Sequence, residues 1–137
     1  FPLCCHYCAF YLLPFTAVLY QNKPEMKRYC LALDLENDPL LISKYIEYHK
    51  EVWPEILSSI KDSGIMDMQI YQVADRLFMI METAEDFSFE KKNKMDSQNP
   101  FVVKWEELMS QFQKPISIAQ PGEKWVLMEK IFELNSD

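Results

Sequence analysis

Apolar and polar residues alternate along three stretches of the chain, and each stretch is predicted to form a β-strand. The first, Lys27–Leu35 (KRYCLALDL), is also rich in side chains that favour extended structure. The next two, Met66–Val73 and Arg76–Thr83, are separated by a very short link and are therefore predicted to form an antiparallel hairpin. On the first strand of this hairpin, the alternation places three apolar side chains on one face: Met66, Met68 and Ile70.

The C-terminal part of the chain carries a fourth alternating stretch, Lys124–Leu134 (KWVLMEKIFEL). A loop with two prolines and a glycine precedes it. Because the alternation runs through the whole stretch, we predict one long strand here.

Helical spacing appears between the first strand and the hairpin. Asp38 is a good N-cap, and Pro39 suits the first helical position. The apolar residues then recur at helical intervals as far as Val52. Because Pro54 restricts the backbone of Trp53, this helix should end or kink there, and a second helix should start at Pro54.

A second helical region follows the hairpin. One helix is predicted around Phe87–Met95, and Asn99 with Pro100 is predicted to begin another. The second of these helices is expected to turn a row of apolar residues inward: Phe101, Val102, Trp105, Leu108, Met109 and Phe112.

The order strand, helices, two strands, helices, strand is that of the ferredoxin-like split βαβ motif. We therefore predict an α+β domain spanning residues 26–137, with a four-stranded antiparallel sheet and helices on one face. The strands carry apolar residues on both faces, so the face without helices needs a cover. A second copy of the same sheet is the simplest cover, which predicts a homodimer.

Residues 1–25 differ in composition from the rest of the chain. They are apolar and aromatic, and Pro14 interrupts the longest apolar run. A basic start and a clear cleavage site, both typical of a signal peptide, are not apparent. Cys5 and Cys8 beside His6 have no second ligand pair for a tetrahedral metal site. We interpret residues 1–25 as an N-terminal extension outside the fold.

Charge and composition exclude several classes of function. The net charge is −7, which disfavours binding to nucleic acid or to an anionic membrane surface. The two glycines, Gly64 and Gly122, form no glycine-rich phosphate loop. Beyond residue 25 the sequence contains one cysteine, Cys30, which indicates a reducing, cytoplasmic environment rather than a disulfide framework.

His49 is the residue best suited to proton transfer near neutral pH. It follows Tyr45 by four residues, so both side chains project from one helix face. Trp53 and Trp105 could wall a pocket beside them, and aromatic rings next to a few polar groups suit a sugar. The alternative is that His49 is a packed boundary residue and that the aromatic residues belong to the core.

Several motifs in the sequence resemble those of the L-rhamnose mutarotase family, in the same order and with similar spacing from about Met26 to Leu134. The most specific is Tyr-x-x-x-His-x-x-x-Trp-Pro-Glu, within YIEYHKEVWPEI. The others are Gly64, IYQVADRLFMIME, WEELM and the closing EKIFEL.

This resemblance implies a ferredoxin-like homodimer that interconverts the α and β anomers of L-rhamnose without a metal or other cofactor. The family's proton-donating histidine falls on His49, and its substrate-contacting tyrosine falls on Tyr45. The first of two paired tryptophans falls on Trp105, but the second position is Glu106, and a further sugar-binding tyrosine falls on Met68. These two departures leave open which 6-deoxy sugar binds, L-fucose included.

Mutarotation requires one acid and one base. The resemblance implies that His49 is the acid and that Tyr45 orients the sugar. The base remains open among Glu82, Glu106 and a water molecule. Two other functions remain as alternatives: a non-catalytic dimer that binds a small molecule, and a different enzyme with the same architecture, such as a small monooxygenase or a cyclase.

Overall fold

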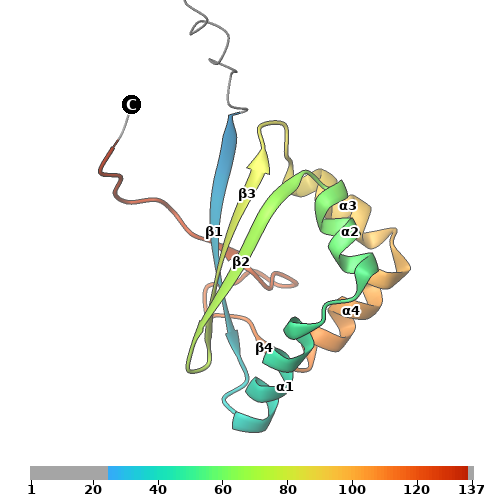
Figure 1. Ribbon diagram of the computed structural model, residues 1–137. Helices are drawn as coiled ribbons and strands as arrows, with labels where there is room; N and C mark the ends of the chain where they lie inside the picture. Colours follow the sequence, from blue (N-terminus) through green and yellow to red (C-terminus); the bar gives the residue numbers. More distant parts are fainter. Residues whose placement is uncertain (1–24, 136–137) are drawn as a thin grey trace, which may run out of the picture.

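The computed structural model describes residues 25–135, which form one antiparallel sheet with four helices (Figure 1). The predicted extension therefore lies, apart from Glu25, outside the described residues. None of the helices within residues 25–135 is long and apolar enough to cross a membrane. The elements in chain order are β1 Met26–Leu35, α1 Pro39–Lys50, α2 Pro54–Asp62, β2 Ile65–Val73, β3 Arg76–Ala84, α3 Phe89–Ser97, α4 Pro100–Ser110, β4 Gln113–Lys114 and β5 Val126–Leu127.

The strand order β2-β3-β1-β4, with β5 also paired to β1, confirms the predicted α+β architecture. The fourth strand position is divided between two short pieces. β4 pairs with Asp34 and Leu35 at the end of β1, and β5 pairs with Leu31 and Ala32 at its middle. The helices lie on one side of the sheet.

The hairpin forms as predicted, but its register differs at one residue. A register shift between Ile65 and Asp67 interrupts the pairing of β2 with β3, as expected for a β-bulge. Ile65 is consequently buried, whereas Met66 is 55% exposed. The expectation that Met66 shares the inward face with Met68 and Ile70 is therefore wrong, because a bulge reverses the alternation that precedes it.

The helix boundaries follow from local chemistry. Asp38 Oδ1 accepts a hydrogen bond from the Leu40 amide at 2.9 Å, and Asn99 Oδ1 accepts one from the Phe101 amide at 3.1 Å. Gly64, just beyond α2, has φ +96°, a conformation that glycine adopts without strain. Phe101 is 48% exposed, so its predicted inward position is wrong: it lies in the first turn of α4, ahead of the buried row.

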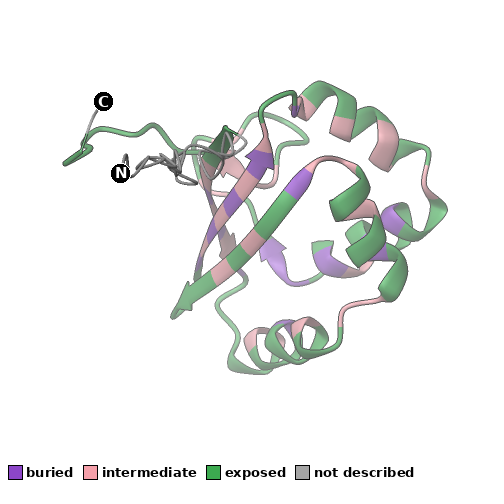
Figure 2. Cartoon of the chain, turned by 45° about the horizontal axis from the view of Figure 1, so that its top comes forward, coloured by how far each residue is buried: buried purple, intermediate pink, exposed green. Residues whose placement is uncertain are grey.

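The sheet has two unlike faces, as the burial pattern in Figure 2 shows. The face under the helices is the core, with Leu33, Leu35 and Leu77 almost fully buried. The opposite face is termed the open face. Alternation and register assign it the following residues: Arg28, Cys30, Ala32 and Asp34 of β1; Arg76, Phe78, Ile80 and Glu82 of β3; and Gln69, Tyr71 and Val73 of β2.

The long C-terminal strand predicted over Lys124–Leu134 is wrong, because only Val126–Leu127 is a strand. The Met128 amide still donates to the Cys30 carbonyl at 2.8 Å, and the chain then runs away from β1 (Figure 1). Ile131 is 93% exposed. Continued in the register of β5, residues 129–132 would lie opposite residues 29–26 of β1, but the chain leaves this edge after Met128, and alternation alone does not form a strand without pairing.

Candidate active site

Tyr45 and His49 project from the same side of α1, one turn apart. Their ring centroids lie 4.3 Å from each other, and the His49 ring lies 5.7 Å from that of Trp105 on α4. Ring contacts between α1 and α4, on the helix side of the sheet, therefore bring together three of the residues that the sequence singled out. His49 is partly exposed, whereas Tyr45 and Trp105 are buried.

The orientation of the His49 ring is fixed by the backbone of its own helix. Its Nδ1 lies 2.8 Å from the Tyr45 carbonyl oxygen. Because a carbonyl can only accept a hydrogen bond, Nδ1 carries a proton, and Nε2 is the nitrogen that can take up or release one. Burial lowers the pKa of His49 below its ordinary value, although the bond to the Tyr45 carbonyl opposes this effect. The ring is therefore mainly neutral at pH 7.

Tyr45 is held as a neutral phenol. Burial raises its pKa to about 12, and a side-chain hydrogen bond with Gln113 acts in the opposite direction. A phenol with such a high pKa does not release its proton near pH 7. Tyr45 is therefore suited to orienting a ligand or a neighbouring side chain by hydrogen bonding rather than to transferring protons.

Aromatic rings surround this pair. Trp53, at the break between α1 and α2, lies 5.1 Å from the Trp105 ring in an edge-on arrangement. Tyr48 lies 6.4 Å from Trp105 and 5.8 Å from Phe112. These rings form an apolar wall next to the polar atoms of His49, the combination that small-molecule sites use.

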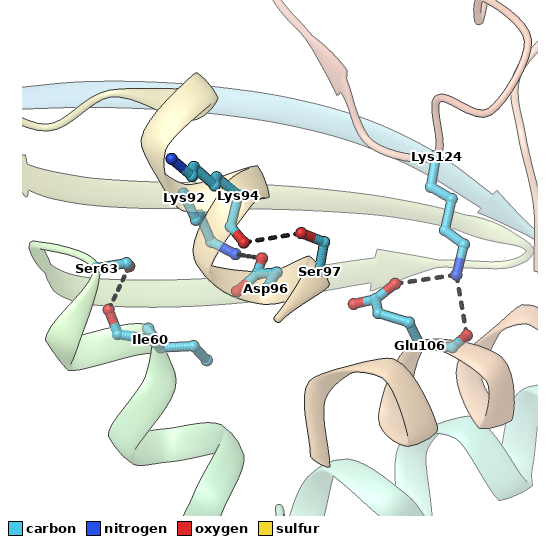
Figure 3. A network of polar contacts seen from close by, with 8 residues as sticks. All are labelled: Ile60, Ser63, Lys92, Lys94, Asp96, Ser97, Glu106 and Lys124. Carbon is cyan, nitrogen blue, oxygen red and sulfur yellow. Dashed lines mark hydrogen bonds and ion pairs between the residues drawn. The ribbon is translucent and has the colours of Figure 1, made fainter. Parts of the chain in front are cut away.

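Glu106 and Met68 do not belong to this aromatic cluster. Glu106 follows Trp105 by one residue and points toward the loop that precedes β5, where its carboxylate pairs with Lys124 at 2.9 Å (Figure 3). Lys124 also donates to the Glu106 carbonyl at 3.0 Å. Met68 faces the helices but packs in the neighbouring core cluster, around Ile65 and Met79.

Glu82, one of the open choices for the base, lies on the open face, where Arg28 pairs with it at 2.7 Å. His49 lies on the helix side of the sheet. Successive strand residues point to opposite faces, so the sheet separates Glu82 from His49. Glu82 is therefore excluded as the base that acts together with His49. Within residues 25–135, no three His, Cys, Asp or Glu side chains converge in a way that could hold a metal ion.

Two cavities adjoin α4, and the His49 ring lines neither of them. One has a volume of about 290 Å³ and lies between α3, α4 and Lys124. The other has a volume of about 440 Å³ and lies between Gln113, Ser110 and the loop 115–124. The larger cavity is of the size used for small ligands. It is connected to the His49 cluster through Gln113, which lines the cavity and also bonds to Tyr45.

The L-rhamnose mutarotase family model matches residues 28–134, which is most of the chain. The chain belongs to the L-rhamnose mutarotase family. It is thus an isomerase of the sugar mutarotase class, and the residues matched include the whole of the aromatic cluster around His49.

Individual mutarotases are similar to the chain to different degrees. An L-fucose mutarotase from Xanthomonas campestris pv. campestris is 40% identical over 112 residues, covering 80% of this chain and 90% of its own length. An L-rhamnose mutarotase from Acidiphilium cryptum is 37% identical over 41 residues, 30% of this chain and 39% of its own. The crystal structure of L-rhamnose mutarotase from Formosa agariphila superposes with a TM-score of 0.60 at 20% identity, covering 80% of this chain and 99% of that one. This last similarity shows the fold.

Gln113 is a residue of this region that the sequence did not reveal. A glutamine between a buried phenylalanine and a lysine at a helix end resembles an ordinary exposed loop residue. The signal that identifies it is structural: the two-residue strand β4 pairs with the end of β1 and turns Gln113 toward the core.

Proposed function

We propose that this mutarotase interconverts the α and β anomers of L-rhamnose or of a related 6-deoxy sugar such as L-fucose. The observation that carries the proposal is the His49 ring, whose Nδ1 is bound to the Tyr45 carbonyl while the ring stays partly exposed beside Trp105. Two relatives with matching sequence are named as mutarotases, one of L-fucose and one of L-rhamnose, which agrees with a substrate of this class.

The proposed reaction proceeds by opening and reclosing the pyranose ring. The anomeric hydroxyl at C1 loses a proton while the ring oxygen gains one, and the bond between C1 and the ring oxygen breaks to give the aldehyde. Rotation about the C1–C2 bond turns the other face of the carbonyl to the C5 hydroxyl, and reclosure gives the other anomer. Each positioned acid or base contributes ~10²–10⁴-fold.

His49 is proposed as the main proton-transfer group. The family resemblance assigns it the acid role, for which the imidazolium form must be present. Because the pKa of His49 is lowered, the neutral form predominates at pH 7. We therefore propose that neutral His49 accepts the proton of the anomeric hydroxyl on opening and returns it to the same oxygen on reclosure. A water molecule then donates the proton that the ring oxygen gains on opening and takes it back on reclosure.

The preferred sugar depends on the contacts around the ring. L-Rhamnose and L-fucose differ in configuration at C2 and C4 and share the methyl group at C5. The rings of Trp105 and Trp53 offer an apolar surface that suits this methyl group and the C–H face of either pyranose. Tyr45 and Trp105 are the proposed sugar contacts, together with the positions Met68 and Glu106.

The proposal is tested by saturation-transfer NMR of the anomeric protons of both sugars. The wild-type protein should accelerate exchange for at least one of them. His49→Ala should lower this acceleration by ~10²–10⁴-fold. Lys44→Ala, at an exposed position of the same helix, is the control and should retain it. Wild-type protein that leaves the exchange rate at its value in buffer would refute the proposed function.

The pH dependence separates the two roles of His49. If neutral His49 accepts the proton, the catalysed rate is lost as pH falls through its lowered pKa, below 6.5, and is constant above it. If imidazolium is the active form, the rate is lost as pH rises through the same pKa. The profile of kcat/KM, corrected for exchange in buffer alone, decides between these outcomes.

We further propose that two copies pair through the open face. Cys30, Ala32, Phe78 and Ile80 are only partly buried there. The charges at the two ends of this apolar strip are already paired within one copy, Arg28 with Glu82 and Asp34 with Arg76, so two strips can meet without unpaired like charges. The C-terminal segment, residues 128–135, leaves the sheet beyond β1 and carries exposed apolar side chains that would extend this contact.

A further inference from the structure

Gln113 occupies a position where a polar side chain has little access to water. It lies in β4, directly opposite Leu35 of β1, and is only 8% exposed. Its neighbour Phe112 is packed in the core beneath α1 and α4. Leu35 is 1% exposed and points to the helix side, and Gln113 points the same way because paired residues share a face.

The amide oxygen of Gln113 has no hydrogen-bond partner within residues 25–135, and it is the one buried side-chain polar atom of this part of the chain in that state. Buried polar atoms in proteins are nearly always hydrogen-bonded, so an exception requires a reason. Gln113 also lies close enough to Tyr45 for its amide to lower the pKa of the phenol, against the larger effect of burial. Gln113 therefore has Tyr45 as a polar neighbour and still has an unused acceptor.

The surroundings of Gln113 provide room for a ligand. It lines the cavity of about 440 Å³ whose opposite wall is the loop 115–124. The loop is fixed at its far end, where Lys124 binds both the carboxylate and the backbone carbonyl of Glu106. The amide oxygen itself is covered, so a small, hydroxyl-bearing molecule in this cavity would reach it once the Gln113 side chain turns toward the cavity.

We propose that Gln113 is a positioning residue of the sugar site, whose amide oxygen accepts a hydrogen bond from a ring hydroxyl of the substrate. This inference rests on the proposed mutarotase function. Tyr45 lies between the two parts of the site, since its ring packs against that of His49 with centroids 4.3 Å apart and its pKa is lowered by the nearby amide of Gln113. The hydroxyl that binds Gln113 thereby sets which ring atoms reach His49.

The test compares Gln113→Met with Gln111→Met. Methionine has nearly the length of glutamine and no amide, and Gln111 is an exposed glutamine at the end of α4. Gln113→Met should lower kcat/KM for the preferred sugar about tenfold, mainly by raising KM, because one substrate hydroxyl loses its acceptor. Gln111→Met should match the wild type.

A second readout identifies the hydrogen bond itself. The 2-deoxy, 3-deoxy and 4-deoxy forms of the preferred sugar each lack one hydroxyl. Wild-type protein and Gln111→Met should both discriminate about tenfold against the analogue that lacks the bound hydroxyl, whereas Gln113→Met should lose this discrimination. A purely structural role of Gln113 would change the amount of folded protein but leave this pattern intact.

The outcomes are distinguishable from a failure of the proposed function. If the wild-type protein accelerates no anomeric exchange, the mutarotase proposal fails and this inference fails with it. If the wild-type protein is active but Gln113→Met keeps its kcat/KM and its pattern toward the deoxy sugars, only the role of Gln113 is overturned.

Discussion

The two faces of the sheet are built from the same alternating strands but differ in what covers them. On the helix side, Leu31, Leu33 and Leu35 of β1 are 6%, 0% and 1% exposed. On the open face, the residues between them, Cys30 and Ala32, are only partly buried. The helix side holds the fold together and carries the His49 cluster, whereas the open face holds apolar surface that the helices leave uncovered.

This difference in cover suggests that the helix side determines the stability of one copy and that the open face determines assembly. Burial of apolar side chains is the dominant favourable contribution to folding, and it is concentrated under the helices. The open face combines apolar residues at its centre with paired charges at its ends, a pattern that suits contact with a second copy. A substitution on one face should therefore affect a different property from a substitution on the other.

The largest effect is expected on the helix side. Leu33→Ala should lower the free energy of unfolding by about 2–5 kcal/mol, because the removed methyl groups leave a cavity in a fully buried position. Urea denaturation followed by circular dichroism measures the change. Val73→Ala, on the open face and 72% exposed, is the matched control and should change stability by about 0.5 kcal/mol or less. Equal losses of unfolding free energy in Leu33→Ala and Val73→Ala would contradict the expectation that stability is concentrated on the helix side.

A smaller effect on stability, with a clear effect on assembly, is expected at the centre of the open face. Phe78→Asp places a charge between Ala32 and Tyr71 and should convert a dimer to a monomer, because an unpaired charge buried in an interface is unfavourable. Sedimentation equilibrium measures the mass. Leu40→Asp, at an exposed residue on α1, should leave the mass unchanged. A wild-type protein that is monomeric would remove the dimer proposal.

The smallest effect is expected at the edge of the open face. Asp34 Oδ1 and Oδ2 accept hydrogen bonds from Arg76 at 2.9 and 3.2 Å, and in one copy the Arg76 side chain is 64% exposed and the Asp34 side chain 20%. Asp34→Asn should hardly change the stability of a single copy, since exposed ion pairs contribute little. It should weaken dimerisation modestly by leaving Arg76 unpaired, which dilution experiments measure. A clear loss of single-copy stability would show that the Asp34–Arg76 pair stabilises the folded monomer rather than the dimer.

The sequence predicted the helix boundaries and the hairpin well because they depend on local chemistry. Asp38, Asn99 and the Trp53–Pro54 step each act within a few residues of themselves. The long strand expected at Lys124–Leu134 was wrong because a strand exists only where it pairs with a neighbour, and the alternation of the sequence does not show that pairing with β1 stops after Leu127. Met66 was misplaced for a similar reason, since a bulge is decided by pairing with β3.

The candidate site was predictable in part. The spacing of Tyr45 and His49 places both on one helix face, and this alone brings their rings together. The approach of Trp105 depends on how α4 is placed relative to α1, which was expected from its aromatic character and which the spacing within one helix does not determine. Gln113 was not predictable, because its burial results from a two-residue strand that no sequence pattern indicates.

The attachment of Lys124 to Glu106 has a consequence for how this enzyme can change over evolution. One wall of the larger cavity is a loop that is held at both ends. It follows β4 at Gln113, and at its other end Lys124 binds Glu106 of α4. Residues between these anchors can be exchanged, shortened or lengthened without disturbing the sheet or the helices. Under the proposed placement of the sugar, substitutions in this loop would alter which sugar is preferred while the His49 cluster stays unchanged.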